Sequence, residues 1–516
     1  MKNVLEWLEQ TTLRLPDKYA FLDMERELSF QELLERAQSI GTALAKEAKS
    51  SAPIPVFSRR NVYTPSLFWG VTYSGHAYVP VDSRLPKARI QKILTQLSPS
   101  IILTDAESRE TVKEITGEMA ADFPEADADA ARGRAIRILT AEELLRTQAD
   151  PVLLGEIRSR MLETDPLYII YTSGSTGNPK GVITSHRSLI CYIDAYSKVM
   201  RIEENDRLGN QSPLDYIAAI RDMYLPLKHG CSTLIIPKEY FMEPNRLFEC
   251  MNTYQVTSVG WSVSAFTIAL SLGAFEEVTL TSLKKVCFSG SVMPGKCLRV
   301  WQEHLPDARF VNQYGPTEAT ASCTYYVVDH VVSEDELIPI GRPYDNYRVF
   351  ILNDRNEEAA AGEPGEICIG GPCLALGYYG DPERTRAAFM QHPGNDCYRE
   401  WIYRTGDIGL RREDGLLEFH GRKDRQIKHM GHRVELDEIE YAANQLPQVK
   451  ESCCVYQKEK EKLHLFYQGD ITKRDLLLKL RESLPDFMVP RKVRQMDALP
   501  KLPNGKIDMN RIREEL

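Results

Sequence analysis

Short apolar runs alternate with amphipathic helical stretches over roughly the first 325 residues of the chain. The runs 76–81 and 100–104 are examples, and each lies between stretches with helical spacing of apolar residues. Parallel strands need long crossover connections, which are usually helices. The alternation therefore predicts an α/β fold in which parallel sheets are covered by helices.

The pattern changes towards the end of the chain. From about 330 to 420 the apolar runs are short and are separated by Gly, Pro and Asp, which predicts a small β-rich unit. After Asp424 the pattern predicts a helix, two strands and a second helix, which together make a compact α+β domain. Residues 121–135 are polar and low in complexity, so we expect a surface loop there.

Composition narrows the class of protein. A chain of 516 residues is too long for one hydrophobic core, and its 27% of charged residues is typical of a globular protein. The net charge of −9 argues against a nucleic-acid partner. No apolar run approaches the roughly 20 residues of a membrane helix. The eleven cysteines lack Cys-x-x-Cys pairs, which predicts reduced thiols in the cytoplasm, and Cys453-Cys454 reads as strand packing.

One glycine-rich segment indicates a phosphate ligand. It reads Tyr171-Thr-Ser-Gly-Ser-Thr-Gly-Asn-Pro-Lys-Gly181 and follows the apolar run 167–170, so a buried strand leads into a loop. Glycines let the backbone approach a ligand, amides and hydroxyls donate to phosphate oxygens, and Lys180 adds a positive charge. The segment is not a Walker A loop, because no Gly-Lys-[Ser/Thr] closes it.

Four further segments follow this loop in order. They are Asn312-Gln-Tyr-Gly-Pro-Thr-Glu318, Tyr403-Arg-Thr-Gly-Asp407, Gly421-Arg-Lys-Asp-Arg-Gln-Ile-Lys428 and Pro503-Asn-Gly-Lys506. In order and spacing the five segments resemble the adenylate-forming superfamily. That superfamily holds the adenylation domains of nonribosomal peptide synthetases, acyl- and aryl-CoA ligases, and luciferases. The resemblance covers essentially the whole chain.

Within the superfamily, the chain most resembles stand-alone adenylation domains of the D-alanine–carrier protein ligase type. The turn Gly431-His-Arg-Val-Glu435 and the ending 502–508 favour this type over most CoA ligases. The resemblance implies an N-terminal domain, 1–424, with two αβ-layered subdomains and a small distorted β-barrel. It also implies a small, mobile α+β C-terminal domain, 425–516, that carries the catalytic lysine, with Asp424 as the hinge.

The resemblance further implies ATP and Mg²⁺ as cofactors. The residues expected to bind ATP are Thr172, Ser173, Gly174, Ser175, Thr176, Lys180, Gly290, Asn312, Gln313, Tyr314, Gly315, Thr317, Asp407, Arg422 and Lys506. Tyr314 can stack on adenine, Asp407 can accept both ribose hydroxyls, and Thr317 can reach the α-phosphate. Glu318 is the expected Mg²⁺ ligand, because a hard cation that bridges phosphates prefers oxygen ligands.

The expected catalytic residues are Lys506, Lys428 and Thr317. By resemblance, Lys506 bridges ATP and the substrate carboxylate, and Lys428 lies in the segment that faces the site during thioester formation. His186 follows the phosphate loop, but a carboxylate is already ionised at pH 7 and needs no base. We therefore expect a structural role for His186.

The acid pocket departs from the family pattern. The aligned pocket positions are Ile217, Ala218, Arg221, Ser264, Cys287, Ser289, Gln313, Ala321 and Ser322. Amino-acid-activating relatives have an aspartate at the position of Ile217, where it pairs with the substrate ammonium group. Two explanations remain open: Asp215 takes that role, or the substrate lacks an α-amino group there. Arg221 either contacts a polar or anionic substrate group or pairs with Asp222 or Asp215.

These observations lead to one functional hypothesis and two alternatives. The protein is expected to adenylate a small carboxylic acid, amino-acid-like or modified, and to pass the acyl group to the phosphopantetheine thiol of a separate carrier protein. The first alternative is an acyl- or aryl-CoA ligase that uses free CoA. The second is a non-catalytic nucleotide-binding member. We expect neither a nucleic-acid nor a membrane partner.

Overall fold

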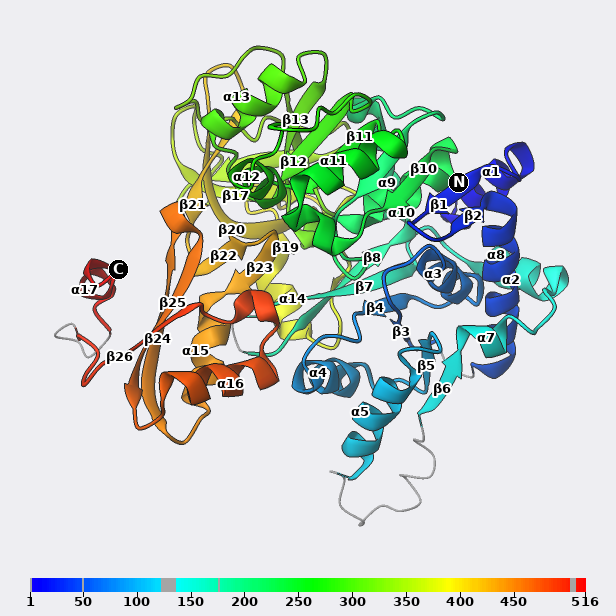
Figure 1. Ribbon diagram of the computed structural model, residues 1–516, viewed down its shortest axis with the longest axis horizontal. Coiled ribbons are helices and arrows are strands. Elements are labelled where there is room, and N and C mark those ends of the chain that lie inside the picture. Colours follow the sequence, from blue (N-terminus) through cyan, green and yellow to red (C-terminus); the bar gives the residue numbers. More distant parts are fainter. Residues whose placement is uncertain (1, 49–50, 122–135, 175–176, 502–506) are drawn as a thin grey trace. The chain divides into compact units, whose positions relative to one another are not determined.

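The computed structural model describes residues 2–48, 51–121, 136–174, 177–501 and 507–516 (Figure 1). The chain divides into two compact units. The first unit consists of Met1–Ser83, Leu97–Ile170 and Gly181–Lys423. The second consists of Arg84–Gln96, Tyr171–Lys180 and Asp424–Leu516. The glycine-rich loop thus belongs to the same unit as the C-terminal segment.

A nine-stranded sheet forms one part of the first unit, in the order β15-β14-β13-β12-β11-β9-β10-β1-β2. Its strands are β1 (Tyr19–Leu22), β2 (Glu27–Ser29), β9 (Arg207–Asn210), β10 (Ser232–Ile235), β11 (Ser258–Ser262), β12 (Lys285–Ser289), β13 (Arg309–Tyr314), β14 (Thr324–Val328) and β15 (Arg342–Pro343). The strands from β13 to β1 in this order are parallel, and β2, β14 and β15 are antiparallel to their neighbours. The parallel sheet predicted from the alternating pattern is confirmed.

Helices cover both faces of this sheet, as strand β12 illustrates. Val286 and Phe288 pack in a cluster with α11 (Pro244–Thr253), α12 (Val263–Ser271) and α13 (Gly295–His304). Figure 1 shows these helices around the strands β11 to β13. Cys287, between them, packs in a second cluster with α9 (His186–Met200) and α10 (Ala219–His229). Alternate side chains of a strand point to opposite faces, so an apolar strand such as β12 requires cover on both sides.

A seven-stranded sheet of order β18-β8-β7-β4-β3-β5-β6 forms another part. Its strands are β3 (Ile54–Phe57), β4 (Tyr78–Val81), β5 (Ile101–Thr104), β6 (Arg137–Thr140), β7 (Pro166–Thr172), β8 (Lys180–Ser185) and β18 (Gly377–Tyr378). The N-terminal helices are α1 (Leu5–Arg14), α2 (Phe30–Glu47), α3 (Thr64–Tyr73), α4 (Lys87–Leu97), α5 (Arg109–Ala121), α7 (Ala141–Leu144) and α8 (Pro151–Arg160). Helix α2 begins at a capping box in which Ser29 and Glu32 bond each other's backbone N–H, so its start is encoded locally.

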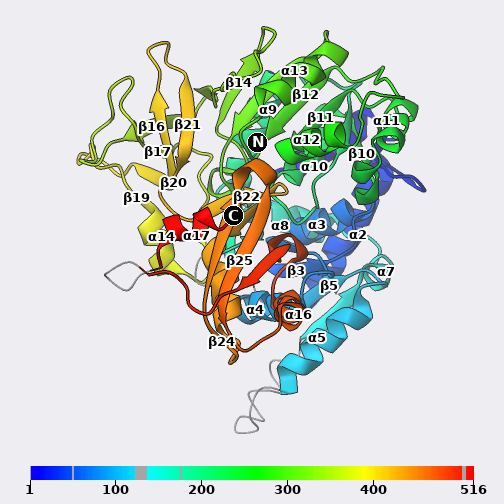
Figure 2. The same ribbon diagram turned by 60° about the vertical axis from the view of Figure 1, so that its left-hand side comes forward.

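The predicted β-rich unit is a five-stranded antiparallel sheet (Figure 2). Its strands are β16 (Arg348–Leu352), β17 (Gly365–Gly370), β19 (Phe389–Gln391), β20 (Trp401–Arg411) and β21 (Leu417–Arg422), with α14 (Pro382–Ala388) between β18 and β19. The pairings follow β16-β17-β20-β19, and β21 also pairs with β20. A distorted barrel was expected here. Over the described residues it is an antiparallel sheet in which the long strand β20 pairs with β17, β19 and β21.

The C-terminal part of the second unit begins with a hairpin that the sequence pattern did not predict. Its elements are β22 (Gln426–His429), β23 (His432–Glu435), α15 (Leu436–Asn444), β24 (Val449–Gln457), β25 (Lys462–Gly469), α16 (Lys473–Ser483), β26 (Lys492–Gln495) and α17 (Met509–Glu514). Cys453 and Cys454 lie on β24 and pack in different clusters on its two faces. The strand-packing interpretation of this pair is therefore confirmed. All eleven cysteines are free thiols.

In the described part of the chain, no helix has the length and apolarity to cross a membrane. From residue 122 onwards, the surface loop expected over 121–135 lies outside the described residues.

Candidate active site

The carboxyl ends of β11, β12 and β13 form one edge of the nine-stranded sheet. In the strand register Ser262 lies opposite Ser289, and Ser289 lies opposite Gln313. Ligands of open parallel sheets bind outside the carboxyl ends of the strands. Gly290, directly after β12, has a φ of +100°, and a Cβ placed on it would meet no atom within 4 Å. Open space therefore adjoins this edge.

Three residues predicted to bind ATP contact one another in the first unit. Tyr314 ends β13, Asp407 lies on β20, and Arg422 lies opposite Asp407 on β21. The Tyr314 hydroxyl donates a hydrogen bond to the Asp407 carboxylate, which also forms an ion pair with the Arg422 guanidinium. Burial, and then the charge of Asp407, raise the pKa of Tyr314 well above its ordinary value, so the hydroxyl keeps its proton. An aromatic ring and a carboxylate are thus held together by contacts within the protein.

Glu318 is fully buried in the short 3₁₀ turn η3 (Thr317–Ala319). One of its carboxylate oxygens accepts a hydrogen bond of 2.8 Å from the Tyr378 hydroxyl. Its backbone carbonyl accepts a hydrogen bond of 2.9 Å from the amide of Ala375. Proteins usually bind Mg²⁺ through one or two carboxylates together with substrate phosphates. A single oriented carboxylate such as that of Glu318 fits this donor set.

Neighbouring members of the same motif have protein partners of their own. The side-chain amide of Asn312 donates to the carbonyl oxygen of Pro339 at 2.8 Å, so one of its two N–H groups has a protein acceptor. The Gln313 carbonyl oxygen accepts from the Ser322 hydroxyl at 3.3 Å. Gly315 packs so closely that a Cβ on it would lie 2.4 Å from the Cα of Ser322. These contacts fix the loop that follows β13.

The glycine-rich loop is bonded to the C-terminal segment within the second unit. The Ser173 hydroxyl donates to the carbonyl oxygen of Arg433 at 2.8 Å, and the Gly174 amide donates to the Glu438 carboxylate at 3.2 Å. Glu438 also forms a buried ion pair of 2.7 Å with Arg89. Two groups predicted to donate to phosphate oxygens therefore have protein acceptors in this structure.

The remaining residues of the predicted nucleotide site and catalytic set are only partly described. Thr172 is the last residue of β7 and Lys180 the first of β8, so strands define both ends of the loop. Lys428 lies on β22, opposite Arg433 in the hairpin register. Ser175, Thr176 and Lys506 lie outside the described residues.

Arg221 occupies the first turn of α10 and is only 2% exposed. Its guanidinium donates to the carbonyl oxygen of Gly260 on β11, and its Nε lies 3.9 Å from the Asp222 carboxylate. A Cβ at position 260 would lie 2.3 Å from Arg221 Nε, so only glycine leaves room for this side chain. The pairing with Asp222 that the sequence left open is present, but at ion-pair distance rather than as a hydrogen bond.

Aromatic hydroxyls and a thiol surround this guanidinium. Its carbon lies 5.9 Å from the centre of the Tyr196 ring. Burial raises the pKa of Tyr192 to about 12 and that of Cys287 to about 11, although nearby Arg221 lowers both. Burial alone would lower the pKa of Arg221, but Tyr196, Cys287, Tyr192 and Asp222 raise it overall. At neutral pH the guanidinium therefore keeps its charge, and the Tyr192 hydroxyl and the Cys287 thiol beside it keep their protons.

The other predicted pocket residues belong to several different elements. Ile217 and Ala218 precede α10, and Ile217 is buried in the apolar core. Ser264 lies in the first turn of α12, and Cys287 and Ser289 lie on β12. Ala321 and Ser322 follow η3. The prediction that these residues bind the acid stays a prediction.

Sequence reasoning missed two tyrosines that lie beside Arg221, and it expected a structural role for His186. Tyr192 and Tyr196 were not predicted, although their spacing of four residues on a helix places them on one face. His186 is buried, its Nδ1 accepts from the Val4 amide at 3.4 Å, and burial lowers its pKa to about 4. These contacts suit the structural role expected for His186.

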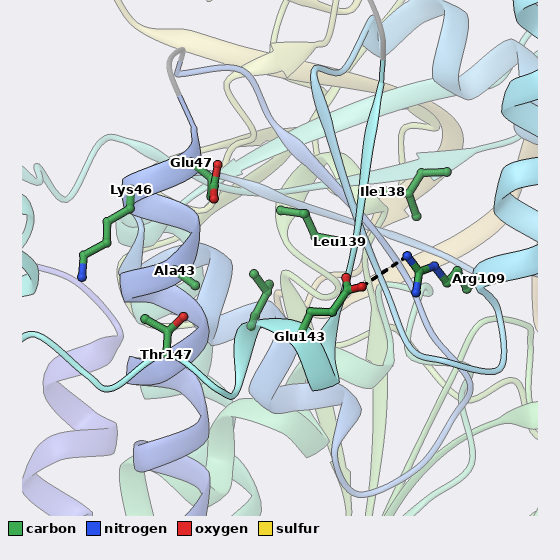
Figure 3. Close-up of a pocket in the computed structure, with 9 residues that line it drawn as sticks. Ala43, Lys46, Glu47, Arg109, Ile138, Leu139, Glu143 and Thr147 are labelled. Carbon is green, nitrogen blue, oxygen red and sulfur yellow. Dashed lines mark ion pairs between the residues drawn. The ribbon is translucent and has the colours of Figure 1, made fainter.

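A separate surface depression of about 400 Å³ lies in the first unit (Figure 3). Its lining residues are Ala43, Lys46, Glu47, Arg109, Ile138, Leu139, Glu143, Leu144 and Thr147. Arg109 and Glu143 form an ion pair of 3.2 Å with each other there, and both side chains are more than a third exposed. No residue of the predicted site lines this depression.

Comparison with protein families identifies the class of enzyme. The AMP-binding enzyme family matches residues 8–379, and the AMP-binding enzyme C-terminal domain matches residues 438–506. The chain belongs to the AMP-binding enzyme family. A D-alanine–D-alanyl carrier protein ligase of Bacillus licheniformis is 30% identical over 535 residues, covering 99% of both chains. The Bacillus cereus ligase of the same name is 29% identical over 531 residues, again covering 99% of both.

Solved structures agree on the fold. The adenylation domain AlmE of Vibrio cholerae, in complex with glycyl-adenosine-5'-phosphate, has a TM-score of 0.83 and 24% identity, covering 100% of this chain and 98% of that one. An artificial fusion of an adenylation domain and a PCP domain from Klebsiella oxytoca has a TM-score of 0.79 and 22% identity, covering 96% and 93%. As a member of the AMP-binding enzyme family, the protein is an ATP-dependent ligase that joins an acid to a thiol.

Proposed function

We propose that this AMP-binding enzyme converts a small carboxylic acid into its acyl-adenylate and loads the acyl group onto the phosphopantetheine thiol of a separate carrier protein. The observation that carries the proposal is the contact set of Tyr314, Asp407 and Arg422 in the first unit. A ring fixed by its own hydroxyl can stack on adenine, and a carboxylate paired with an arginine can accept the ribose hydroxyls.

In the first half-reaction a carboxylate oxygen of the acid attacks the α-phosphorus of ATP. The bond to the leaving oxygen breaks with its electron pair, and pyrophosphate departs. The carboxylate is already ionised, so the chain's task is to align two anions and to balance their charge. Thr317 is proposed to contact the α-phosphate. Glu318 is proposed to hold Mg²⁺, which would neutralise phosphate charge.

In the second half-reaction the carrier thiol, losing its proton, attacks the acyl carbon. A thioester forms and AMP leaves with the electron pair of the broken bond. Lys506 is proposed to serve the first step and Lys428 the second, with a hinge at Asp424 between domains 1–424 and 425–516. Because the first step consumes ATP and the second uses the free thiol of a holo-carrier protein, we place the reaction in the cytoplasm.

The names of the relatives favour a carrier protein over free CoA as acceptor. Two relatives that cover 99% of the chain are named as carrier protein ligases. A fused adenylation–PCP chain also shares the fold. The names of the relatives do not identify the acid that this protein uses, because Ile217 stands where amino-acid-activating members are expected to have an aspartate.

Acid-dependent exchange of labelled pyrophosphate into ATP tests the first step, over a panel of amino, hydroxy, keto, aryl and dicarboxylic acids. At least one acid should support exchange, and holo-carrier protein should then be acylated at micromolar concentration. Efficient turnover with millimolar CoA, and none with any holo-carrier tested, would instead make the protein a CoA ligase.

Lys506→Ala gives the sharpest variant for this proposal. Loss of one transition-state contact should lower acid-dependent exchange by roughly 100-fold or more. Transfer from a presynthesised acyl-adenylate to the carrier should stay near the wild-type rate. An equal loss in both assays would contradict the division of labour between Lys506 and Lys428.

A further inference from the structure

A buried cluster of hydrogen-bond donors lies in the first unit where β12 and β13 end and α9 and α10 pack on the sheet. Its members are Arg221 on α10, Tyr192 on α9, Gln313 on β13 and Ser322. The Ser322 hydroxyl lies 3.3 Å from the Gln313 carbonyl oxygen. Burial raises the pKa of Tyr192, and Arg221 and Ser322, as donors directed towards its hydroxyl, lower it. The proton of that hydroxyl has no acceptor among the described residues.

Three donors of this cluster have no hydrogen-bond acceptor among the described residues. They are Arg221 Nε, the Tyr192 hydroxyl and Gln313 Nε2. Their side chains are almost fully buried, with 2%, 0% and 2% exposure in that order. Buried polar groups in native proteins nearly always have a partner, so several unpaired donors together need a reason. A ligand that brings its own acceptor supplies one.

The same cluster has little to offer a cation. Ile217, at the position where an aspartate would bind an ammonium group, is buried and apolar. Asp222 already accepts a hydrogen bond of 2.8 Å from Asn210 and faces Arg221. Asp215 also has a partner within the chain. An ammonium group placed here would meet the guanidinium of Arg221 without a free carboxylate to offset it.

We propose that the acid substrate carries, beyond the carboxylate that is adenylated, an oxygen acceptor that Arg221, Tyr192 and Gln313 recognise. The acceptor is a second carboxylate, a carbonyl or a hydroxyl, and an ammonium group in its place is rejected. This inference rests on the proposed function, because it concerns the acid used in that reaction. It makes Arg221 a specificity-determining residue that acts on substrate choice.

Pyrophosphate exchange with matched acids tests the inference. One series is pyruvate, lactate, alanine and isobutyrate, and a second is succinate, β-alanine and butyrate; each varies one group on a common skeleton. We expect the acids with an acceptor to exceed their ammonium and methyl counterparts in kcat/KM by at least about tenfold. Succinate as the best acid assigns a second carboxylate, whereas pyruvate or lactate as the best assigns an uncharged acceptor.

Variants of the cluster separate recognition from folding. Arg221→Met should raise KM for the best acceptor acid on the order of 100-fold, with kcat much less affected and the methyl analogue almost unchanged. Tyr192→Phe keeps the ring and should raise the same KM several-fold. Arg221→Lys keeps the charge but loses the planar fork, and should fall between the two.

Lys285→Met is the matched control. Lys285 is a cation at the opposite end of β12, largely buried in an ion pair of 2.6 Å with Asp206. This variant should lower thermal stability but leave the order of the acids unchanged.

Two outcomes would count against the inference. If alanine were the best acid and Arg221→Met changed the KM of every acid equally, the inference would be wrong and the proposed function would stand. If no acid supported exchange in the wild-type enzyme, the proposed function would fail and the inference with it.

Discussion

Two buried polar groups of the first unit use the same kinds of side chain in opposite ways. In the Tyr314–Asp407–Arg422 group, the hydroxyl and the guanidinium both end on one carboxylate. In the Arg221 cluster, the Tyr192 hydroxyl and Arg221 Nε have no hydrogen-bond acceptor among the described residues. In the first group both donors have an acceptor within the protein. In the second group the two donors need an acceptor that a ligand provides.

The contrast indicates what each group contributes to a ligand. A satisfied group is held in place by its own hydrogen bonds, so it can position a ligand without first rearranging. An unsatisfied buried donor carries a free-energy cost of about 1–3 kcal/mol that a suitable acceptor removes. We expect substitutions in the first group to lower the stability of the protein. Substitutions in the second group should mainly change which acid the enzyme prefers.

Asp407→Ala should give the largest effect. It leaves Arg422 and the Tyr314 hydroxyl without their shared acceptor, and breaking such a buried pair costs about 3–5 kcal/mol. All five tryptophans lie in the first unit, so urea unfolding followed by tryptophan fluorescence reports on that unit. We also expect a higher KM for ATP. Stability within about 0.5 kcal/mol of the wild type would show that the group is not tightly held.

Asp222→Asn should alter how stability depends on pH. Burial raises the pKa of Asp222 from 3.8 to about 6, although Arg221, Asn210 and Arg60 lower it. Because the folded pKa exceeds the unfolded one, this residue's stabilising contribution is present below about pH 4 and is lost as pH rises through 6.

The variant lacks this titration. From pH 4 to pH 7, the wild type should therefore lose about 2–3 kcal/mol of stability relative to Asp222→Asn. Parallel stability curves, measured by the same fluorescence assay at both pH values, would contradict the raised pKa.

A matched pair of tyrosine variants gives the smallest and cleanest test. Tyr314→Phe removes a hydroxyl bonded to a charged carboxylate and should cost about 1.5–3 kcal/mol of stability. Tyr192→Phe removes a buried hydroxyl without an acceptor, so it should cost no stability and should raise it by up to about 1–3 kcal/mol. Both tyrosines are buried in the first unit, so the difference between them isolates hydrogen bonding from packing. Equal costs would remove the distinction between the two groups.

Much of the fold could be predicted from the sequence because it follows from local patterns. The apolar runs 76–81 and 100–104 became β4 and β5, and most of the Gly- and Pro-punctuated segment became the antiparallel sheet of β16, β17, β19, β20 and β21. The hairpin of β22 and β23 was missed, because its strands are short and rich in charged residues rather than apolar ones.

The residue types of the candidate site could be predicted from the sequence, but their partners in the fold could not. The motifs of the family gave the residue types. The structure brings Tyr314 into contact with Asp407, 93 positions later in the chain, and Asp407 into contact with Arg422. The binding of the glycine-rich loop by Arg433 and Glu438 had no sequence signal, because partners so far apart in sequence meet only through the fold.

The sequence by itself determined the order of the motifs, the family resemblance and the absence of an aspartate at position 217. Only the tertiary structure decided what Arg221 does with its five N–H groups: it bonds Gly260, faces Asp222 and leaves Nε without an acceptor. A side chain's identity is local, whereas its burial and its partners depend on which strands and helices pack beside it. Unsatisfied donors are therefore visible only after the chain has folded.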